Sequence, residues 1–259
     1  MLLPLPVAAQ DALEPLKDFF TLQVRGGIQV FDYSEEFAPL GLESDYQNVA
    51  PAWGAAASLR FAERWRLNGE YLGSFVPEDT ESWRFLGSRA QENDLEVDFH
   101  AFDVDVSYSI ARLPKLEWAV ALGWHYYLLD FERSNFRVFS PFLVAPPGPV
   151  TEEVRGQGVK VGTTLDARIG RRATLSTGVS GSYLYDVDVE NSLLGRLSSE
   201  GWTARWRLGV DFLLTDNATI GVGYHGQYIR VDEASRGLVV LPENRTITHT
   251  LMLQLGVRF

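Results

Sequence analysis

The sequence contains no cysteine, which excludes disulfide bonds and thiolate metal sites. It has no run of 18 apolar residues, although hydrophobic residues make up 46% of its 259 positions, so a transmembrane helix is excluded. The formal net charge is −11, which argues against nucleic-acid binding because phosphate contacts need a basic face. Aromatic residues, in contrast, are plentiful, with 7 Trp, 10 Tyr and 15 Phe.

The first ten residues are similar to the end of a secretory leader. Apolar residues between Leu2 and Val7 precede an Ala-Ala-Gln sequence that matches a small-residue cleavage site. No basic segment precedes them, and two prolines interrupt the short apolar stretch. We interpret residues 1–10 either as a signal-peptide remnant or as a disordered N-terminus, and leave them out of the fold argument.

Period-two alternation of apolar and polar residues dominates the rest of the chain. In the clearest segment, apolar residues from Leu116 to Leu128 alternate with Glu117, Ala119, Ala121, Gly123 and His125. Ten segments share this pattern and are predicted to be strands: 19–32, 51–62, 65–76, 95–111, 116–130, 157–170, 173–188, 201–214, 218–231 and 245–259.

The connections between these segments alternate in length. Short ones lie near 62–64, 111–115, 170–172 and 214–217, and long ones near 33–50, 77–94, 131–156, 189–200 and 232–244. This alternation is typical of a membrane barrel with tight periplasmic turns and long outer loops. We therefore predict an all-β fold: a transmembrane antiparallel up-and-down β-barrel over 19–259, of ten strands, preceded by a periplasmic N-terminal segment over 11–18.

The aromatic residues indicate which face meets lipid, because alternation alone also fits a soluble barrel. Trp and Tyr side chains gather near strand ends on the apolar face, as in the interfacial girdles of a lipid-facing surface; examples are Trp53, Trp65, Trp118, Tyr183, Trp202 and Tyr228. The short turns are mildly basic and the long loops acidic. We predict that the apolar face meets hydrocarbon and that the polar face lines the lumen.

The C-terminal segment carries a family resemblance. Leu251, Leu253, Leu255, Val257 and the terminal Phe259 alternate up to the last residue. This resembles the C-terminal recognition strand of bacterial outer-membrane β-barrel proteins, which ends in an aromatic residue. The resemblance implies a bacterial outer-membrane location in a Gram-negative host, and recognition of Leu255, Val257 and Phe259 by the barrel assembly machinery.

The predicted lumen carries charges of both signs in near balance. They form a predicted network of Arg25, Arg60, Arg66, Glu70, Asp103, Asp105, Glu117, Lys160, Asp166, Arg168, Arg205, Arg207 and Asp211, with Arg258 and Asp186 as further inward charges. A selective pore usually shows one sign in excess, whereas balanced charges pair and close an interior. We expect a plugged or narrow lumen, and keep a conducting, porin-like channel as the alternative.

The segment 95–111 changes phase above Phe102, since Leu95, Val97 and Phe99 are odd-numbered. A β-bulge near Ala101 would return these residues to the lipid side and turn Asp98 and His100 inward. The alternative is that this end of the strand stands clear of the membrane. We favour the bulge.

Catalytic candidates gather on this same segment. Asp98 and His100, followed by Asp103 and Asp105, are similar in residue type to the Asp–His and Asp–Asp pairs with which ten-stranded omptin proteases activate water. In omptins the two pairs face each other across a cleft, whereas here both lie on one strand. An omptin-like hydrolase is therefore the second alternative, and we expect no enzyme, no cofactor and no metal site.

The predicted outer loops carry most of the net charge, and their acidic residues include Glu35, Glu36, Glu43, Asp45, Glu78, Asp79, Glu81, Glu92 and Asp94. They either bind divalent cations that bridge to lipopolysaccharide phosphates or are simply solvated and repelling. We expect an outer-membrane barrel with a structural or interaction role, whose partners are membrane lipids and lipopolysaccharide; its oligomeric state is open.

Overall fold

A computed structural model describes residues 19–37, 41–141, 143–236 and 239–259. Twelve strands follow one another in these described ranges: β1 (Phe20–Phe37), β2 (Leu42–Ala62), β3 (Trp65–Phe85), β4 (Ser88–Leu113), β5 (Leu116–Val138), β6 (Val150–Ile169), β7 (Ala173–Asn191), β8 (Gly195–Leu213), β9 (Ala218–Val231), β10 (Ala234–Arg236), β11 (Val239–Leu241) and β12 (Glu243–Arg258). The predicted segments 1–10 and 11–18 lie outside the described residues.

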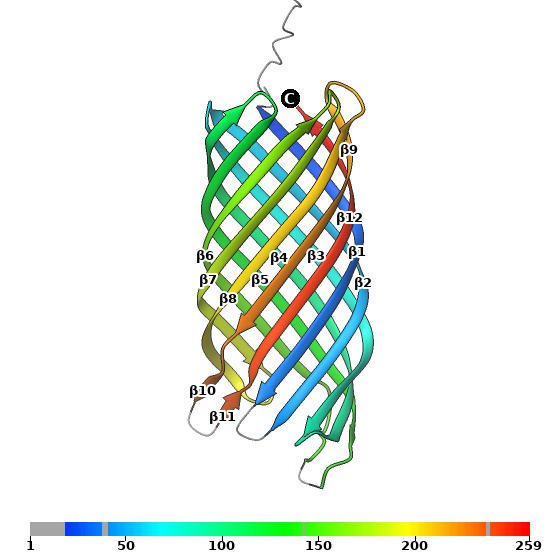
Figure 1. Cartoon of the computed structure of the whole chain (residues 1–259). Coiled ribbons are helices and arrows are strands. Elements are labelled where there is room, and N and C mark those ends of the chain that lie inside the picture. The colour runs from blue at the N-terminus through cyan, green and yellow to red at the C-terminus, as the bar shows by residue number, and fades with distance from the viewer. Residues whose placement is uncertain (1–18, 38–40, 142, 237–238) are drawn as a thin grey trace, which may run out of the picture.

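Ten of these strands close into one antiparallel barrel, in the order β1-β12-β9-β8-β7-β6-β5-β4-β3-β2, so the prediction of ten strands is confirmed (Figure 1). The ring closes where β1 pairs with β12, with Thr21 opposite Arg258. The small strands β10 and β11 form a separate ribbon between β9 and β12.

The two ends of the barrel differ. At the turn end, β1 begins, β12 ends, and short turns join β2 to β3, β4 to β5, β6 to β7 and β8 to β9; this end is uppermost in Figure 1. At the opposite loop end, the strands run much further than the sequence predicted. Most of 33–50 and 77–94, predicted as long loops, is strand. The β3–β4 connection is a two-residue turn in which Leu86 and Gly87 both have positive φ (49° and 76°), the geometry that suits the twist of a hairpin.

The barrel consists of two halves whose inner and outer faces are reversed, as β1 shows. Near the turn end its outward residues run from Leu22 to Val30 and are apolar or glycine, then become Asp32, Ser34 and Glu36. Its inward residues are polar or glycine up to Gln29, then become the buried Phe31 and Tyr33. The switch occurs without any break in the pairing of β1 with β2 or β12.

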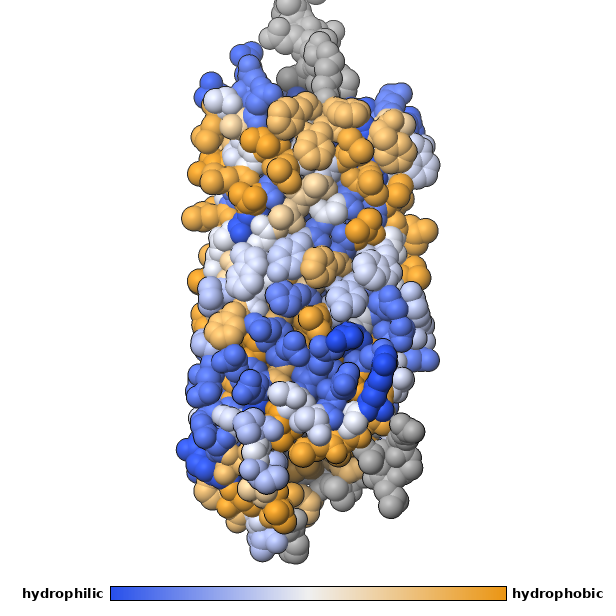
Figure 2. Space-filling model, turned by 180° about the vertical axis from the view of Figure 1, so that it is seen from behind, coloured by the Kyte–Doolittle hydropathy of each residue, from blue (hydrophilic) through white to orange (hydrophobic). Residues whose placement is uncertain are grey.

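The other strands repeat this change. The exposed apolar residues of the turn-end half form an outer apolar band, which includes Val24, Trp53, Leu67, Val104, Leu122, Val161, Leu208, Val222, Leu253 and Leu255. Figure 2 shows apolar side chains gathered toward the turn end and hydrophilic ones over the half nearer the loop end. Inside that second half lies an apolar loop-end core: Phe31, Tyr33, Tyr46, Val76, Leu95, Val97, Phe99, Leu129, Phe131, Val154, Val187, Val189, Leu197, Ile229 and Val231.

The phase change in β4 has the same origin, and the predicted β-bulge near Ala101 is wrong. The pairing of β4 with β3 is regular from Val97 to Tyr108, and with β5 from Asp94 to Ser109. Val97, Phe99 and Ala101 are therefore buried inside the barrel rather than facing outward. The strand crosses from the half with a polar interior into the half with an apolar interior.

Candidate functional site

A polar chamber occupies the turn-end half of the barrel interior. It has a volume of about 290 Å³, and its wall extends from deep residues such as Gln227 and Thr248 to Arg258 at the turn end. Alternation places polar side chains on this inner face because the opposite face of each strand forms the apolar band. The structure places all the residues of the predicted charge network on the inward face of their strands.

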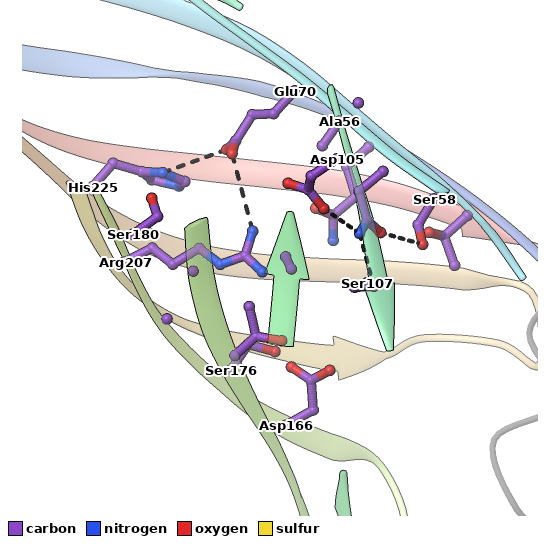
Figure 3. A pocket seen from close by; sticks show the side chains of 18 of the residues that line it. Ala56, Ser58, Glu70, Asp105, Ser107, Asp166, Ser176, Ser180, Arg207 and His225 are labelled. Carbon is purple, nitrogen blue, oxygen red and sulfur yellow. Dashed lines mark hydrogen bonds and ion pairs between the residues drawn. The ribbon is translucent and has the colours of Figure 1, made fainter. Parts of the chain in front are cut away.

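Glu70, on β3, is the centre of the first ion-pair group (Figure 3). Its carboxylate accepts a hydrogen bond from Arg25 and lies 3.9 Å from Arg205 and 4.0 Å from Arg207, measured to the guanidinium nitrogens. His225 Nδ1 is 3.6 Å from Oε1, the same carboxylate oxygen that accepts from Arg25. One carboxylate is thus shared by three guanidinium groups, one from β1 and two from β8.

Asp103, on β4, organises the second group. Its carboxylate contacts Arg205 and lies 2.9 Å from Nδ1 of the fully buried His125 and 3.6 Å from Lys160 Nζ. Lys160 also donates to Asp105 over 2.7 Å. Buried charges are costly unless paired, so these contacts explain how the strands tolerate them.

Glu117, on β5, holds the third group close to the turn end. Arg60 and Arg66 both donate to its carboxylate, as does the Ser109 hydroxyl. Arg66 also reaches Asp166 at 3.6 Å. The two remaining network residues are placed apart from these groups: Asp211 accepts a hydrogen bond from Gln254 at 2.8 Å, and Arg168 lies at the turn end of β6.

In the turn-end half of the barrel the inward charges are not balanced, contrary to the prediction. Asp186 was predicted to face the lumen, but the register of β7 against β8 shifts between Leu184 and Val187, and Asp186 is exposed on the outside. There it accepts a hydrogen bond from Gln157 at 2.6 Å. Without Asp186 the chamber carries an excess of positive charge.

The catalytic candidates do not meet. Asp98 and His100 lie on the outer face of β4, whereas Asp103 and Asp105 are buried on the inner face, so the barrel wall separates the two pairs. His100 Nδ1 is instead 3.0 Å from the Tyr71 hydroxyl, on the outside. The inward turn of Asp98 and His100 depended on the bulge near Ala101, which is absent.

His249, also on the outer face, has the same kind of neighbour. Its Nδ1 lies 2.7 Å from the Tyr224 hydroxyl, and the two rings stack with centroids 6.1 Å apart. The alternation pattern alone does not explain a histidine on the apolar outer face of β12. Its position among Tyr and Trp side chains, just before the outer face becomes polar, fits the interfacial girdle of a membrane barrel.

Buried side chains occupy the interior on the loop-end side of the chamber. First, Gln29 donates to Ser74 over 2.9 Å and accepts from Thr250 over 3.0 Å, which links β1 to β3 and β12. The loop-end core follows, in which Tyr33 and Phe131 pack with ring centroids 4.7 Å apart. The sequence reasoning missed this core, whose signal was the phase reversal of several strands at one height.

Beyond the core, toward the loop end, lies a fourth buried charge group, the Arg133 cluster, formed by Arg133, Glu35, Glu81 and Glu152. Arg133 donates to Glu35 over 2.7 Å and to Glu81 over 2.9 Å, and lies 3.9 Å from Glu152. Glu35 and Glu81 were predicted to lie in the long outer loops, but both are buried inside the barrel. Sequence alternation continued through these residues, and it was the predicted loop boundaries that hid it.

The environment of Glu35 favours its neutral form. Burial raises the pKa of the Glu35 carboxyl from its usual 4.5 to about 7, and the negative charges of Glu152 and Glu81 act in the same direction, against the attraction of Arg133. Three carboxylates around one guanidinium leave the cluster negative when all are ionised. A proton on Glu35 relieves this excess.

No helix in the described part of the chain is long and apolar enough to cross a membrane. No group of three or more His, Asp or Glu side chains among the described residues could hold a metal ion.

Comparison with known proteins gives matches in structure alone. No protein-family model matches the sequence, and no curated protein matches it. The fold is similar to that of the outer membrane protease OmpT from Escherichia coli, with a TM-score of 0.69 and 12% identity over 95% of this chain and all of that one. Weaker likenesses include the translocator domain of the autotransporter NalP from Neisseria meningitidis (TM-score 0.43, 11% identity, 92% and 88% of the two chains) and OprG from Pseudomonas aeruginosa (0.41, 9%, 93% and 97%). The chain therefore has the fold of an outer-membrane β-barrel.

Proposed function

We propose that this chain is a bacterial outer-membrane barrel that does not conduct, closed at the cell surface by its loop-end core and acting through a structural or interaction role. The turn end would then face the periplasm. The observation that carries the proposal is the loop-end core itself, because a filled apolar interior leaves no aqueous path from the chamber to the loop end.

The dimensions of the outer face support the membrane location. From Phe20 to Val30, ten residue steps of about 3.3 Å, tilted by about 40°, rise about 25 Å along the barrel axis. This is the usual height of the apolar band on transmembrane barrels. Leu255 and Val257 lie exposed on β12, and the exposed Phe259 follows it directly, where a C-terminal assembly strand would present its side chains.

Single-channel recording of the refolded protein in planar bilayers tests the closure. We expect no discrete conductance steps from the wild-type chain, because the loop-end core separates the chamber from the far side. Discrete steps that change size in Arg205→Gln would show an open path lined by the chamber and would overturn the proposal. A porin recorded in the same bilayers provides the positive control.

We also propose that the chain is not an omptin-like hydrolase. The separation of Asp98 and His100 from Asp103 and Asp105 by the barrel wall supports this, since water activation needs both pairs on one cleft. The refolded protein should release no product from a fluorogenic peptide library. Turnover that disappears in His100→Ala while the barrel stays folded would contradict this.

A further inference from the structure

We propose that the turn-end chamber is a binding site for small anions that carry a phosphate or carboxylate group, and that Arg207 is the residue that takes the anion. The proposal does not depend on whether the barrel conducts. It rests on the charge of the chamber, the exposure of Arg207 within it, and the groups that surround this side chain.

The charge of the chamber is the first observation. Inward cations of the turn-end half outnumber inward carboxylates by two: Arg25, Arg60, Arg66, Lys160, Arg168, Arg205, Arg207 and Arg258 stand against Glu70, Asp103, Asp105, Glu117, Asp166 and Asp211. The wall around them is apolar on its outer side, so the field inside is poorly screened. Such an excess attracts anions from the solution at the turn end.

Of the three arginines around Glu70, Arg207 is the one most available to a ligand. Its ion pair with Glu70 is long, at 4.0 Å, and that carboxylate is already shared with Arg25 and Arg205. The Arg207 side chain is 41% exposed, against 7% for Arg25 and 11% for Arg205. A guanidinium has five N–H donors, and its fork matches the oxygens of a phosphate or carboxylate.

The neighbouring strand β7 leaves space for the Arg207 side chain. Gly178, on β7, lies opposite Arg207, and a Cβ atom at this glycine would lie 3.1 Å from Arg207 Nε. Ser176 and Ser180 flank the glycine and line the chamber on the same face of β7. Figure 3 shows Ser176, Ser180 and Arg207 around one part of the chamber. Serine hydroxyls are donors that complement a guanidinium in holding an anion.

The size of the chamber limits the ligand. A volume of about 290 Å³ lies at the lower end of small-molecule sites, which span roughly 300–1,000 Å³. Inorganic phosphate or a small organic acid fits this space. Because the loop-end core closes the other side, the anion would enter from the turn end.

Isothermal titration calorimetry with inorganic phosphate, on the refolded protein in detergent micelles at constant ionic strength, tests the site. We expect saturable binding that weakens about tenfold or more in Arg207→Gln, since a charge-assisted hydrogen bond is lost. The matched control is Arg196→Gln, because Arg196 is an exposed arginine at the loop end, ion-paired with Asp188. It should bind phosphate as the wild type does. No saturable heat with the wild type, or equal affinity in Arg207→Gln, would overturn the proposal.

A thiol probe provides a second measurement in an otherwise wild-type chamber, which matters if Arg207→Gln does not refold. The chain has no cysteine, so Ser180→Cys introduces a single thiol. We expect a sulfonate-bearing methanethiosulfonate to react with it about tenfold faster than an ammonium-bearing one, and phosphate to slow the reaction. Ser34→Cys, on the outer face, should show no such preference. Equal rates for the two reagents at Ser180→Cys, or no protection by phosphate, would contradict an anion site.

Discussion

Replacement of Glu35 by glutamine should change how the stability of the barrel depends on pH. The folded state holds the Glu35 proton more tightly than the unfolded chain does, because the pKa rises from 4.5 to about 7 on folding. Between these two values the folded state binds the extra proton, so the free energy of unfolding falls as pH rises through this window. The stabilisation is complete below pH 4.5 and is lost above pH 7.

The size of the effect follows from the shift. A displacement of about 2.5 pKa units corresponds to about 3 kcal/mol between the two ends of the window. Glutamine has the shape of the protonated carboxyl and cannot ionise. Glu35→Gln should therefore match the wild type near pH 5 and be more stable than it at pH 8, by up to about 3 kcal/mol.

Urea unfolding in detergent micelles, followed by tryptophan fluorescence at pH 5 and pH 8, measures this difference. Glu36→Gln is the matched control, since Glu36 is the next residue, exposed on the outer face; it should keep the wild-type pH dependence. The difference in unfolding free energy between Glu35→Gln and the wild type should be larger at pH 8 than at pH 5. An equal difference at the two pH values would refute a neutral Glu35 in the Arg133 cluster.

Two further substitutions test packing inside the barrel. Gly156→Ala should destabilise the protein by about 1–3 kcal/mol, because its Cβ would lie 2.1 Å from the Tyr127 ring. The control is Gly69→Ala, since nothing lies within 4 Å of a Cβ atom there. Equal urea midpoints for the two variants would contradict this packing. Tyr127→Phe should leave stability unchanged or raise it by about 1 kcal/mol. The reason is that the buried Tyr127 hydroxyl has no hydrogen-bond partner among the described residues. A loss of stability in the same assay would reveal a partner for this hydroxyl and contradict the prediction.

The fold could be predicted from the sequence to the extent that alternation specifies it. Period two identifies strands and the two faces of each, and short turns between them predict the up-and-down order. Alternation does not show which face of a strand points into the barrel at a given position along the barrel axis. On β1 the reversal is visible in the sequence, since Phe31 and Tyr33 continue the inward positions of Gln23 and Arg25. On β4, taken by itself, the same reversal predicts a bulge.

The site was predictable only as a set of inward residues. Which charges pair depends on register and on the tilt of the strands around the ring, and neither follows from the pattern within one strand. Arg25 meets Glu70, which is 45 positions away and on a strand that is not its hydrogen-bonded neighbour. Asp186 lies outside the chamber because of one local register shift, and its absence leaves the turn-end half of the interior with an excess of positive charge.

A single-cysteine scan along β1 in proteoliposomes, read out with a water-soluble maleimide, tests most directly that the barrel has two halves with reversed faces. We expect Asp32→Cys and Glu36→Cys to react, and Val24→Cys and Ile28→Cys to be protected by lipid. Phe31→Cys should also be protected, because the loop-end core buries it. Rapid labelling of Val24→Cys and Ile28→Cys would contradict the lipid-facing band, and rapid labelling of Phe31→Cys would contradict the closed interior.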